Sequence, residues 1–383
     1  MTNKKPLRVL YVTHEPNLTG ASRSLVDLLA ALDRSEVEPI VLLRKQGPLV
    51  SKLKELGIAF EIIPYGLAVK GEKTKVPSLV KEVVNAVTVA RIRHLIRTRN
   101  VDLVHNNSLL ADVGMRAARA SKLPYVVHVR DLVNEDHNLD FIDEVRIREL
   151  MASASMNIFI SDFVAKKFRS WIGASPYKVI FNAVNVPGTG SDRKCCPFQN
   201  AAYNLFLPGR FASGKGQLDA INAVADLRKK GYKVFLTLAG TVGQEDYYLA
   251  CKAAVENCPD QAARIEEFID DVGSEYAKSD VTLMCSSAEA MGRVTAEGML
   301  SGTLVIGADA GATSEIITDG KTGLLYKSGD SRDLAEKIEW AINNNAEAAT
   351  IASAGADEAS RVFDSSAYAE QIISIYRDAV DNV

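Results

Sequence analysis

Short runs of apolar residues alternate along the chain with longer segments in which apolar residues recur every three to four positions. The short runs are typical of buried β-strands, and the longer segments, such as residues 20–33 and 76–99, are typical of amphipathic helices. Strands that alternate with helices form a parallel sheet with helices on both faces. In the first half of the chain we predict strands at residues 7–13, 38–44, 60–64, 101–105, 124–129, 156–161 and 177–181.

The alternation stops at residues 187–201, where prolines and glycines interrupt a polar run that is typical of a linker. It then resumes, with predicted strands at residues 203–209, 232–240, 263–269, 281–285, 303–308 and 322–326. The pattern predicts an α/β fold of two doubly wound, Rossmann-like domains, residues 1–186 and 202–365, that face each other across a cleft.

Composition is that of an ordinary soluble protein. The chain has 383 residues, 47% apolar and 24% charged, so each of two domains can bury a core. Its five cysteines form no C-x-x-C pair, and neither a disulfide framework nor a zinc site is expected. This cysteine usage favours a reducing cytoplasm. We expect no signal peptide, because the apolar run near the start is short, and no apolar run reaches the length of about 18 residues that a membrane span requires.

Charge differs between the two halves. Residues 1–190 contain 27 Lys and Arg against 19 Asp and Glu, whereas residues 191–383 contain 18 against 29. A basic half favours an anionic partner, such as a membrane surface, a phosphorylated lipid or a nucleic acid. The alternative is an uneven surface charge that serves no partner.

One motif follows the first predicted strand of the second half. Gly209, Gly214 and Lys215 have the G-x-x-x-x-G-K spacing of a P-loop, but Gly216 stands where a P-loop has the Ser or Thr that holds Mg²⁺. The sequence also has no D-x-D metal motif and no G-x-G-x-x-G after a strand. These features argue against nucleoside triphosphate hydrolysis and nicotinamide chemistry, and we expect neither a metal nor a cofactor.

Arg210 and Lys215 flank the turn that leads into the next predicted helix. Two cations and the amide groups of a helix N-terminus can bind a diphosphate without a metal, because the helix end carries about half a positive charge. The alternative is a plain glycine turn with two solvated cations.

A second candidate cluster follows the predicted strand 281–285. Glu289 and Glu297 lie at E-x7-E spacing, and Gly292 opens a helix between them. The backbone N–H groups of Gly292, Arg293 and Val294 would face a phosphate, and the two carboxylates would accept hydrogen bonds from hydroxyl pairs. The arrangement therefore suits a sugar or ribose attached to that phosphate; the alternative is a helix-capping Glu beside a solvent-facing Glu.

These residues resemble the retaining glycosyltransferases of family 4, which have the GT-B fold. The resemblance covers nearly the whole chain and lies mainly in "PGRFASGKG", "EYAKSDVTLMCSSAEAMGRVTAEGM", "GTLVIGADAGATSEII" and "GKTGLLYKSGDSRDLAEKI". It implies that the second domain binds a nucleoside diphosphate sugar. Arg210 and Lys215 would hold the diphosphate, Glu297 the ribose, and Glu289 the transferred sugar. Gly292, Arg293 and Val294 would contribute backbone contacts, and the base would lie near Phe268 and Ile269.

The first half resembles the same family in fewer positions. "NLTGASRSL" resembles its N-terminal glycine-rich loop, with Thr19 in place of the first glycine and Gly20 in place of the second. His128 corresponds to a histidine close to the transferred sugar, so the implied catalytic residues are His128, Glu289, Arg210 and Lys215. "VIFNAVNV" resembles the end of the first domain, with departures at Ala183 and Asn185. Residues 366–383 resemble a final helix that crosses back onto that domain.

The resemblance implies metal-independent transfer of a sugar, with retention of configuration, to a hydroxyl of a saccharide or lipid-linked saccharide. A UDP-sugar is favoured over a GDP-sugar, and surface polysaccharide or glycolipid synthesis is the expected setting. We expect no nucleic acid partner. Two alternatives use similar diphosphate contacts: a metal-free nucleotide-sugar 2-epimerase, and a sensor that binds the nucleotide sugar without turnover.

The acceptor side has weaker signals. Arg23 is a candidate for contact with an acceptor phosphate. The predicted helix at residues 78–99 carries cations beside apolar residues, so it could lie on an anionic bilayer at the inner face of the membrane. The alternative, which is more common, is that its apolar stripe packs on its own sheet. The cations are Lys81, Arg91, Arg93, Arg97 and Arg99, and the apolar residues are Val83, Val87, Ile92 and Ile96.

Overall fold

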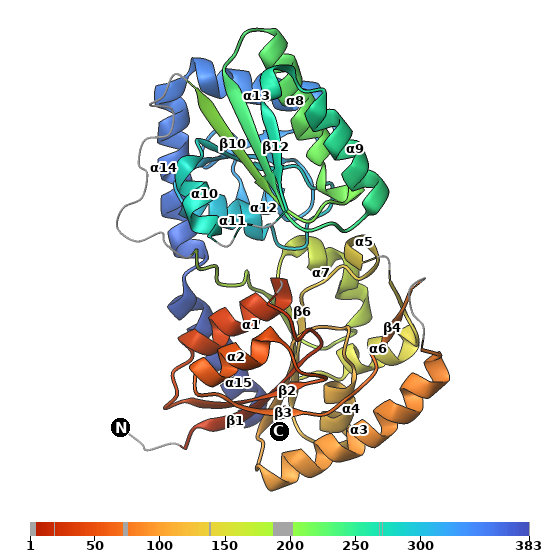
Figure 1. The fold of residues 1–383 in the computed structure, drawn as a ribbon. Helices are drawn as coiled ribbons and strands as arrows, with labels where there is room; N and C mark the ends of the chain where they lie inside the picture. The colour runs from red at the N-terminus through yellow and green to blue at the C-terminus, as the bar shows by residue number, and fades with distance from the viewer. Residues whose placement is uncertain are drawn as a thin grey trace. The chain divides into compact units, whose positions relative to one another are not determined.

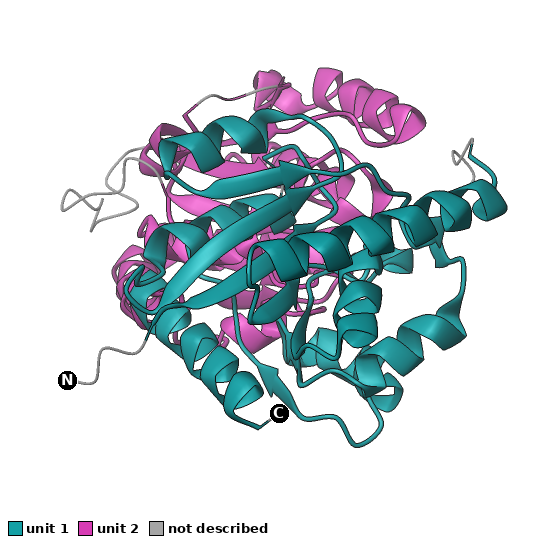
Figure 2. Ribbon diagram, turned by 90° about the horizontal axis from the view of Figure 1, so that it is seen from below, with its two compact units in different colours: residues 1–183, 365–383 teal, residues 184–364 magenta. Residues whose placement is uncertain are grey.

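The computed structural model describes residues 5–18, 20–71, 76–137, 139–186, 202–267, 269 and 271–382, with the backbone alone at residues 136 and 137. It divides into two compact units, residues 1–183 with 365–383 and residues 184–364 (Figure 2). The predicted linker, residues 187–201, lies outside the described residues.

Within the described part of unit 1, seven parallel strands form one sheet in the order β3-β2-β1-β5-β6-β8-β9 (Figure 1). Most residues of these strands are apolar, because helices cover a parallel sheet on both faces. Two further strands, β4 and β7, pair antiparallel outside the sheet. The strands are β1 (Leu7–Thr13), β2 (Val37–Leu43), β3 (Ala59–Ile62), β4 (Val69–Lys70), β5 (Leu103–Asn106), β6 (Tyr125–Val129), β7 (Asp140–Phe141), β8 (Met156–Phe159) and β9 (Tyr177–Val179).

The helices of unit 1 include the last helix of the chain, as expected from the resemblance. One buried core joins α1, α2 and α15 to the sheet through residues such as Leu28, Leu53 and Ile372. The helices are α1 (Gly20–Ala31), α2 (Pro48–Glu55), α3 (Ser78–Thr98), α4 (Val113–Ser121), α5 (Asn134–His137), α6 (Glu144–Ala152), α7 (Asp162–Phe168), the 3-10 helix η1 (Arg169–Trp171) and α15 (Ser365–Asp381).

In unit 2, the described residues form a sheet of six parallel strands in the order β12-β11-β10-β13-β14-β15. The strand order reverses between β10 and β13, as it does between halves of a dinucleotide-binding fold. The strands are β10 (Tyr203–Pro208), β11 (Val234–Ala239), β12 (Ala263–Glu266), β13 (Val281–Met284), β14 (Leu304–Ala308) and β15 (Leu324–Tyr326).

The core of unit 2 is built from the sheet and from helices that include α8, α9, α13 and α14. The helices are η2 (Ser213–Lys215), α8 (Gln217–Lys229), α9 (Glu245–Glu256), η3 (Pro259–Gln261), α10 (Val272–Lys278), α11 (Arg293–Leu300), α12 (Thr313–Ile316), α13 (Ser331–Asn343) and α14 (Asn345–Val362). The two parallel sheets confirm the predicted α/β class and the doubly wound architecture of each unit.

The packing of α15 on unit 1 leads to a stability prediction. Ile372 is fully buried in the core of that unit, whereas Ser374 on the same helix is exposed. Ile372→Ala should lower the free energy of unfolding by about 2–5 kcal/mol, because it leaves a cavity in a packed core. Ser374→Ala should change it by less than about 0.5 kcal/mol. Urea unfolding measures both, and equal effects of the two substitutions would show that α15 does not belong to this core.

Candidate functional site

The predicted donor-binding residues of unit 2 gather where its strand order reverses. Ligands of open parallel sheets bind beyond the carboxyl ends of the strands at this point. Arg210 and Lys215 follow β10, and Glu289 follows β13, its neighbour in the sheet. The topology therefore brings three of the predicted residues to one edge of one sheet.

The loop after β10 is held by close backbone contacts. Gly216 has a left-handed conformation (φ 66°) between η2 and α8, and a Cβ atom there would lie 2.3 Å from the carbonyl oxygen of Cys285. No Ser or Thr fits at this position without moving the loop after β13. The glycine that departs from the P-loop pattern is therefore required by the fold, and position 216 has no room for a side chain that carries a hydroxyl.

The loops after β10, β13 and β14 are linked to one another. The Ser287 amide donates to the Gly214 carbonyl at 3.0 Å, which joins the first two loops. The Ala312 amide donates to the Glu289 carbonyl at 2.9 Å, and a Cβ atom on Gly311 would lie 2.5 Å from the Glu289 nitrogen. The backbone of Glu289 is thus fixed from two sides.

The side chains of Lys215 and Glu289 form an ion pair, with Nζ 2.7 Å from Oε2. Both remain partly accessible, with exposed fractions of 30% and 17%. A ligand can compete for either partner of this pair, because both side chains remain partly accessible. The sequence predicted both residues but not that they contact each other.

Gly292 precedes helix α11 as its N-cap residue; it has a left-handed conformation (φ 78°) and no side chain that caps the helix. The first turn contains Arg293 and Val294, as predicted, and it contains no acidic residue. A helix N-terminus of this composition favours an anion, because its amide groups and the helix dipole both attract negative charge.

Glu297 lies one turn further along α11 and is nearly buried. Its Oε1 lies 2.8 Å from Nε of Arg293, and Tyr276 on α10 donates its hydroxyl to Oε2 at 3.0 Å. Tyr276 was missed in the sequence, where nothing in a short helical segment marks it as a partner of a residue 21 positions away. The predicted role of Glu297 in binding ribose hydroxyls stays a prediction.

Arg210 and the other predicted donor-binding residues have different surroundings. The Arg210 side chain lies against the backbone of Gly243, where a Cβ atom would approach its Cγ within 2.8 Å. Ile269 packs on the small apolar cluster of Phe206, Ala239 and Tyr276. Phe268 lies outside the described residues.

In unit 1, His128 is fully buried at the end of β6. Its Nδ1 lies 3.1 Å from Nη2 of Arg130. A guanidinium cannot accept a hydrogen bond, so Nδ1 must accept and Nε2 carries the proton. Nε2 has no hydrogen-bond partner among the described residues. Burial, and the nearby charge of Arg130, hold the pKa of His128 well below its ordinary value, so the ring is neutral near pH 7.

Arg130 is a buried cation whose side chain donates to neutral groups. Its Nε donates to Asn107 Oδ1 at 2.9 Å, its Nη1 donates to Asn182 Oδ1, and its Nη2 lies 3.3 Å from the hydroxyl of Tyr368 on α15. A buried charge requires such hydrogen bonds to remain ionised. Arg130 was not predicted from the sequence, although its position two residues after His128 could have indicated that the two side chains lie close together.

The predicted glycine-rich loop lies near this cluster. Gly20 begins α1, and the carbonyl of Ala21 accepts a hydrogen bond from Asn107 at 3.4 Å. Arg23 is exposed on α1, and Thr19 lies outside the described residues. Asn107 therefore connects the start of α1 to Arg130, and through it to His128.

Within the described ranges, no group of three or more His, Cys, Asp or Glu side chains is placed to hold a metal ion. Every helix in the same ranges is too short or too polar to cross a membrane.

The contact of Gly216 with Cys285 predicts a specific defect. Gly216→Ser should destabilise unit 2 by more than Gly320→Ser, because Gly320 has a similar φ of 69° but open space around its Cα. Both substitutions carry a strain of about 1–3 kcal/mol, and only Gly216→Ser adds a steric clash. Thermal unfolding of the two variants gives the difference. Equal stability would mean that the loops after β10 and β13 do not pack as described.

The buried histidines predict a pH dependence of stability. Burial holds the pKa of both His105 and His128 well below the ordinary value. In the unfolded chain both bind a proton near pH 6.5, so below this pH the unfolded state binds more protons and stability falls. The loss approaches about 1.4 kcal/mol per pH unit for each histidine.

Urea unfolding between pH 7 and pH 5 tests this prediction by comparing the native chain with the double variant His105→Gln/His128→Gln. The variant should lose stability less steeply as the pH falls. Identical slopes would contradict the assignment of two neutral buried histidines.

Comparisons with known proteins support the architecture and the family. Residues 18–186 match the family model "Glycosyltransferase Family 4", and residues 197–358 match "Glycosyl transferases group 1". The chain is 24% identical to a phosphatidyl-myo-inositol mannosyltransferase of Mycobacterium leprae, over 75% of this chain and 76% of that protein.

Two crystal structures are similar over nearly the full chain. Anabaena HepE in complex with UDP is 25% identical, with a TM-score of 0.78 over 96% of this chain and 99% of HepE. A glycosyltransferase of Rickettsia africae is 20% identical, with a TM-score of 0.80 over 99% of this chain and 100% of that one. With one model matching each half and two Rossmann-like units in that order, the chain belongs to the family 4 glycosyltransferases of GT-B fold.

Proposed function

We propose that the protein transfers a sugar from a nucleoside diphosphate sugar to a hydroxyl group of a saccharide or lipid-linked saccharide. One observation carries the proposal: at the point where the strand order of unit 2 reverses, a lysine and a glutamate form an accessible ion pair beside an uncapped helix N-terminus. The complex of the similar HepE with UDP favours UDP as the nucleotide.

The departing diphosphate would be stabilised by fixed positive charge. Lys215 and Arg210 supply two cations, and the first turn of α11 supplies backbone N–H groups. These groups take the place of the divalent ion that many nucleotide-dependent enzymes use, which is why we propose a metal-independent reaction. Activity in the presence of EDTA would follow.

The ion pair suggests how donor binding prepares the site. Before the donor binds, Lys215 is engaged by Glu289. A pyrophosphate competes for the ammonium group, and the Glu289 carboxylate then becomes available to accept hydrogen bonds from hydroxyls of the transferred sugar. The two residues would thereby bind opposite ends of the same sugar–phosphate linkage.

His128 would act as a hydrogen-bond donor. Its neutral ring carries the proton on Nε2, as the contact with Arg130 requires, so this nitrogen can donate to a sugar oxygen and cannot accept a proton. We therefore assign the removal of the acceptor proton to the leaving diphosphate oxygen. The bond between the anomeric carbon and that oxygen breaks, the acceptor oxygen bonds to the same face, and configuration is retained.

The acceptor is proposed to belong to a surface polysaccharide or a glycolipid pathway, with the protein working at the cytoplasmic side. The name of the mycobacterial relative, a phosphatidyl-myo-inositol mannosyltransferase, favours an acceptor of lipid type.

A panel of UDP- and GDP-sugars tests the function, with EDTA present and with and without saccharide acceptors. Release of UDP that depends on an acceptor supports transfer. Rearrangement of the donor sugar without any acceptor would instead indicate a 2-epimerase, and binding without turnover would indicate a sensor. A requirement for Mg²⁺ would contradict the role given to the two cations.

The role of the cations predicts the kinetics of two variants. Lys215→Ala and Arg210→Ala should each lower kcat/KM by about 10- to 150-fold, because a charge-assisted contact contributes about 1.5–3 kcal/mol. Lys229→Ala is the matched control, since Lys229 is an exposed lysine at the far end of α8, and it should change kcat/KM by less than about threefold. A loss of less than about threefold in the first two variants would count against the assignment.

A further inference from the structure

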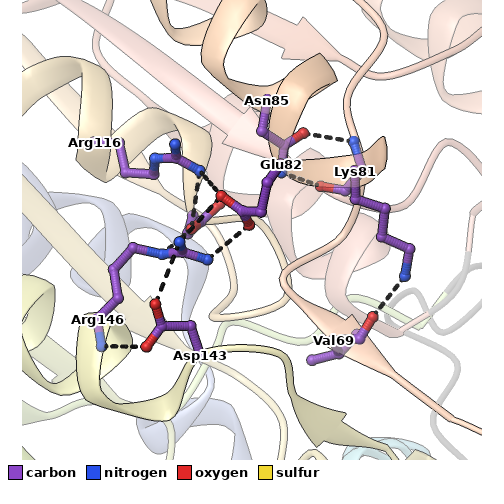
Figure 3. Close-up of polar contacts among 9 residues, drawn as sticks. Val69, Lys81, Glu82, Asn85, Arg116, Asp143 and Arg146 are labelled. Atoms are coloured by element: carbon purple, nitrogen blue, oxygen red, sulfur yellow. Dashed lines mark hydrogen bonds and ion pairs between the residues drawn. The ribbon is translucent and has the colours of Figure 1, made fainter. Parts of the chain in front are cut away.

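The first half of helix α3 has its polar side chains turned inward. Lys81 is buried and donates from Nζ to the carbonyl oxygen of Val69 at 2.8 Å (Figure 3). Asn85 is buried and bonds both backbone groups of Gly66, at 2.7 and 3.1 Å. Thr88 is also buried and donates to the carbonyl of Pro64 at 2.7 Å. These bonds satisfy backbone groups of the segment between β3 and α3.

Ion pairs also connect the inward face of α3 to neighbouring helices. Glu82 lies between two arginines, with Oε1 2.9 Å from Arg146 on α6 and Oε2 3.3 Å from Arg116 on α4 (Figure 3). Arg146 also lies 3.0 Å from the fully buried Asp112. Burial raises the pKa of that carboxyl, and the two arginines act in the opposite direction. The network fixes the rotation of α3 about its axis.

The outward face of the same turns is apolar. Leu79, Val83 and Val87, which are spaced four residues apart, are 78%, 62% and 59% exposed, and Val80 and Val84 flank them at 49% and 41%. Among the described residues, twelve large apolar side chains are exposed, and six of them lie between residues 76 and 87. A helix on the surface of a soluble protein has the opposite arrangement, with its apolar stripe packed on the core.

The second half of α3 has apolar side chains on its buried face and basic side chains on its exposed face. Ile92, Leu95 and Ile96 are buried, whereas Arg91 and Arg97 are exposed. The sequence analysis grouped Val83 and Val87 with Ile92 and Ile96 in one stripe and placed Lys81 among the cations beside it. That grouping was wrong, because the two valines and the two isoleucines lie on opposite faces and Lys81 is buried.

We propose that the outward face of α3 docks into the interfacial layer of an anionic lipid bilayer. This face, called the α3 face below, consists of Leu79, Val80, Val83, Val84 and Val87 with Arg91, Arg93 and Arg97. The apolar residues would enter the boundary between headgroups and acyl chains, and the arginines would bind lipid phosphates.

Charge selects a bilayer over a second copy of the chain as the occupant. The exposed residues of α3 include arginines, and Glu82, the one acidic residue of the helix, is engaged by the inward network. Two such faces would bring like charges together, which disfavours self-association. An anionic surface instead complements both parts of the face. The inference is about binding alone and does not depend on the proposed transfer reaction.

Vesicle flotation tests the proposal with the full-length protein. Vesicles of phosphatidylcholine mixed with phosphatidylglycerol should carry the protein to the top of the gradient at low salt, and vesicles of phosphatidylcholine alone should carry much less. High salt should weaken the binding, because exposed charges are screened. Absence of binding to the mixed vesicles at low salt would overturn the proposal, whatever the enzymatic activity.

Two variants locate the contact. Leu79→Ser/Val83→Ser should weaken binding to the mixed vesicles by at least about tenfold, because it removes the two most exposed apolar side chains of the α3 face. The matched control, Val145→Ser/Leu249→Ser, changes two apolar residues elsewhere that are 68% and 53% exposed, and it should leave binding unchanged. Arg91→Gln/Arg97→Gln should weaken binding about fivefold per arginine.

Two results would overturn the assignment of the α3 face. One is an equal loss in the test pair and the control pair. The other is a concentration-dependent dimer in size-exclusion chromatography that Leu79→Ser/Val83→Ser abolishes, with no change in vesicle binding, which would make the face an interface between copies of this chain. Circular dichroism checks that each variant is folded before its binding to vesicles is compared with that of the native protein.

Discussion

The close approach of Gly216 to the carbonyl of Cys285 is the contact on which the candidate site of unit 2 depends. It brings the loop after β10 against the loop after β13 and leaves no room for a side chain at residue 216. Lys215, the preceding residue, then reaches Glu289, and the loop after β14 holds the backbone of Glu289 in place. The same constraint explains why the sequence departs from the P-loop pattern: packing excludes a hydroxyl at position 216, and the lysine forms an ion pair with Glu289.

Unit 1 fixes its candidate residue in a different way. His128 is oriented by a buried arginine whose charge is satisfied by amides and a tyrosine hydroxyl rather than by a carboxylate. Tyr368 comes from the last helix of the chain, so the end of the sequence supports a residue near its first third. Because a guanidinium can only donate, this arrangement sets the tautomer of His128, and it gives the ring one chemical capability, which is to donate from Nε2.

The sequence was sufficient to predict the architecture, because strands that are buried on both faces leave continuous apolar runs that are easy to recognise. Local spacing also marked Lys215 and Gly292 beside glycine turns, and the structure places them after β10 and β13. Their role in donor binding stays a prediction. The sequence was insufficient to predict side-chain contacts between residues that lie far apart in the chain. Tyr276 meets Glu297, and Arg130 meets Asn182 and Tyr368, only after the chain has folded. The faces of α3 were misjudged for a related reason: its inward polar residues are satisfied by backbone groups of a neighbouring segment, which periodicity does not reveal.

The most direct measurement of the central claim is a crystal structure with an unhydrolysed UDP-sugar analogue, grown in EDTA. The account predicts that the pyrophosphate lies against the Lys215 ammonium and the first turn of α11, with the Lys215–Glu289 contact broken and Glu289 turned toward sugar hydroxyls. A pyrophosphate bound away from Lys215 and Arg210, or one that binds only when Mg²⁺ bridges it to the protein, would contradict the account.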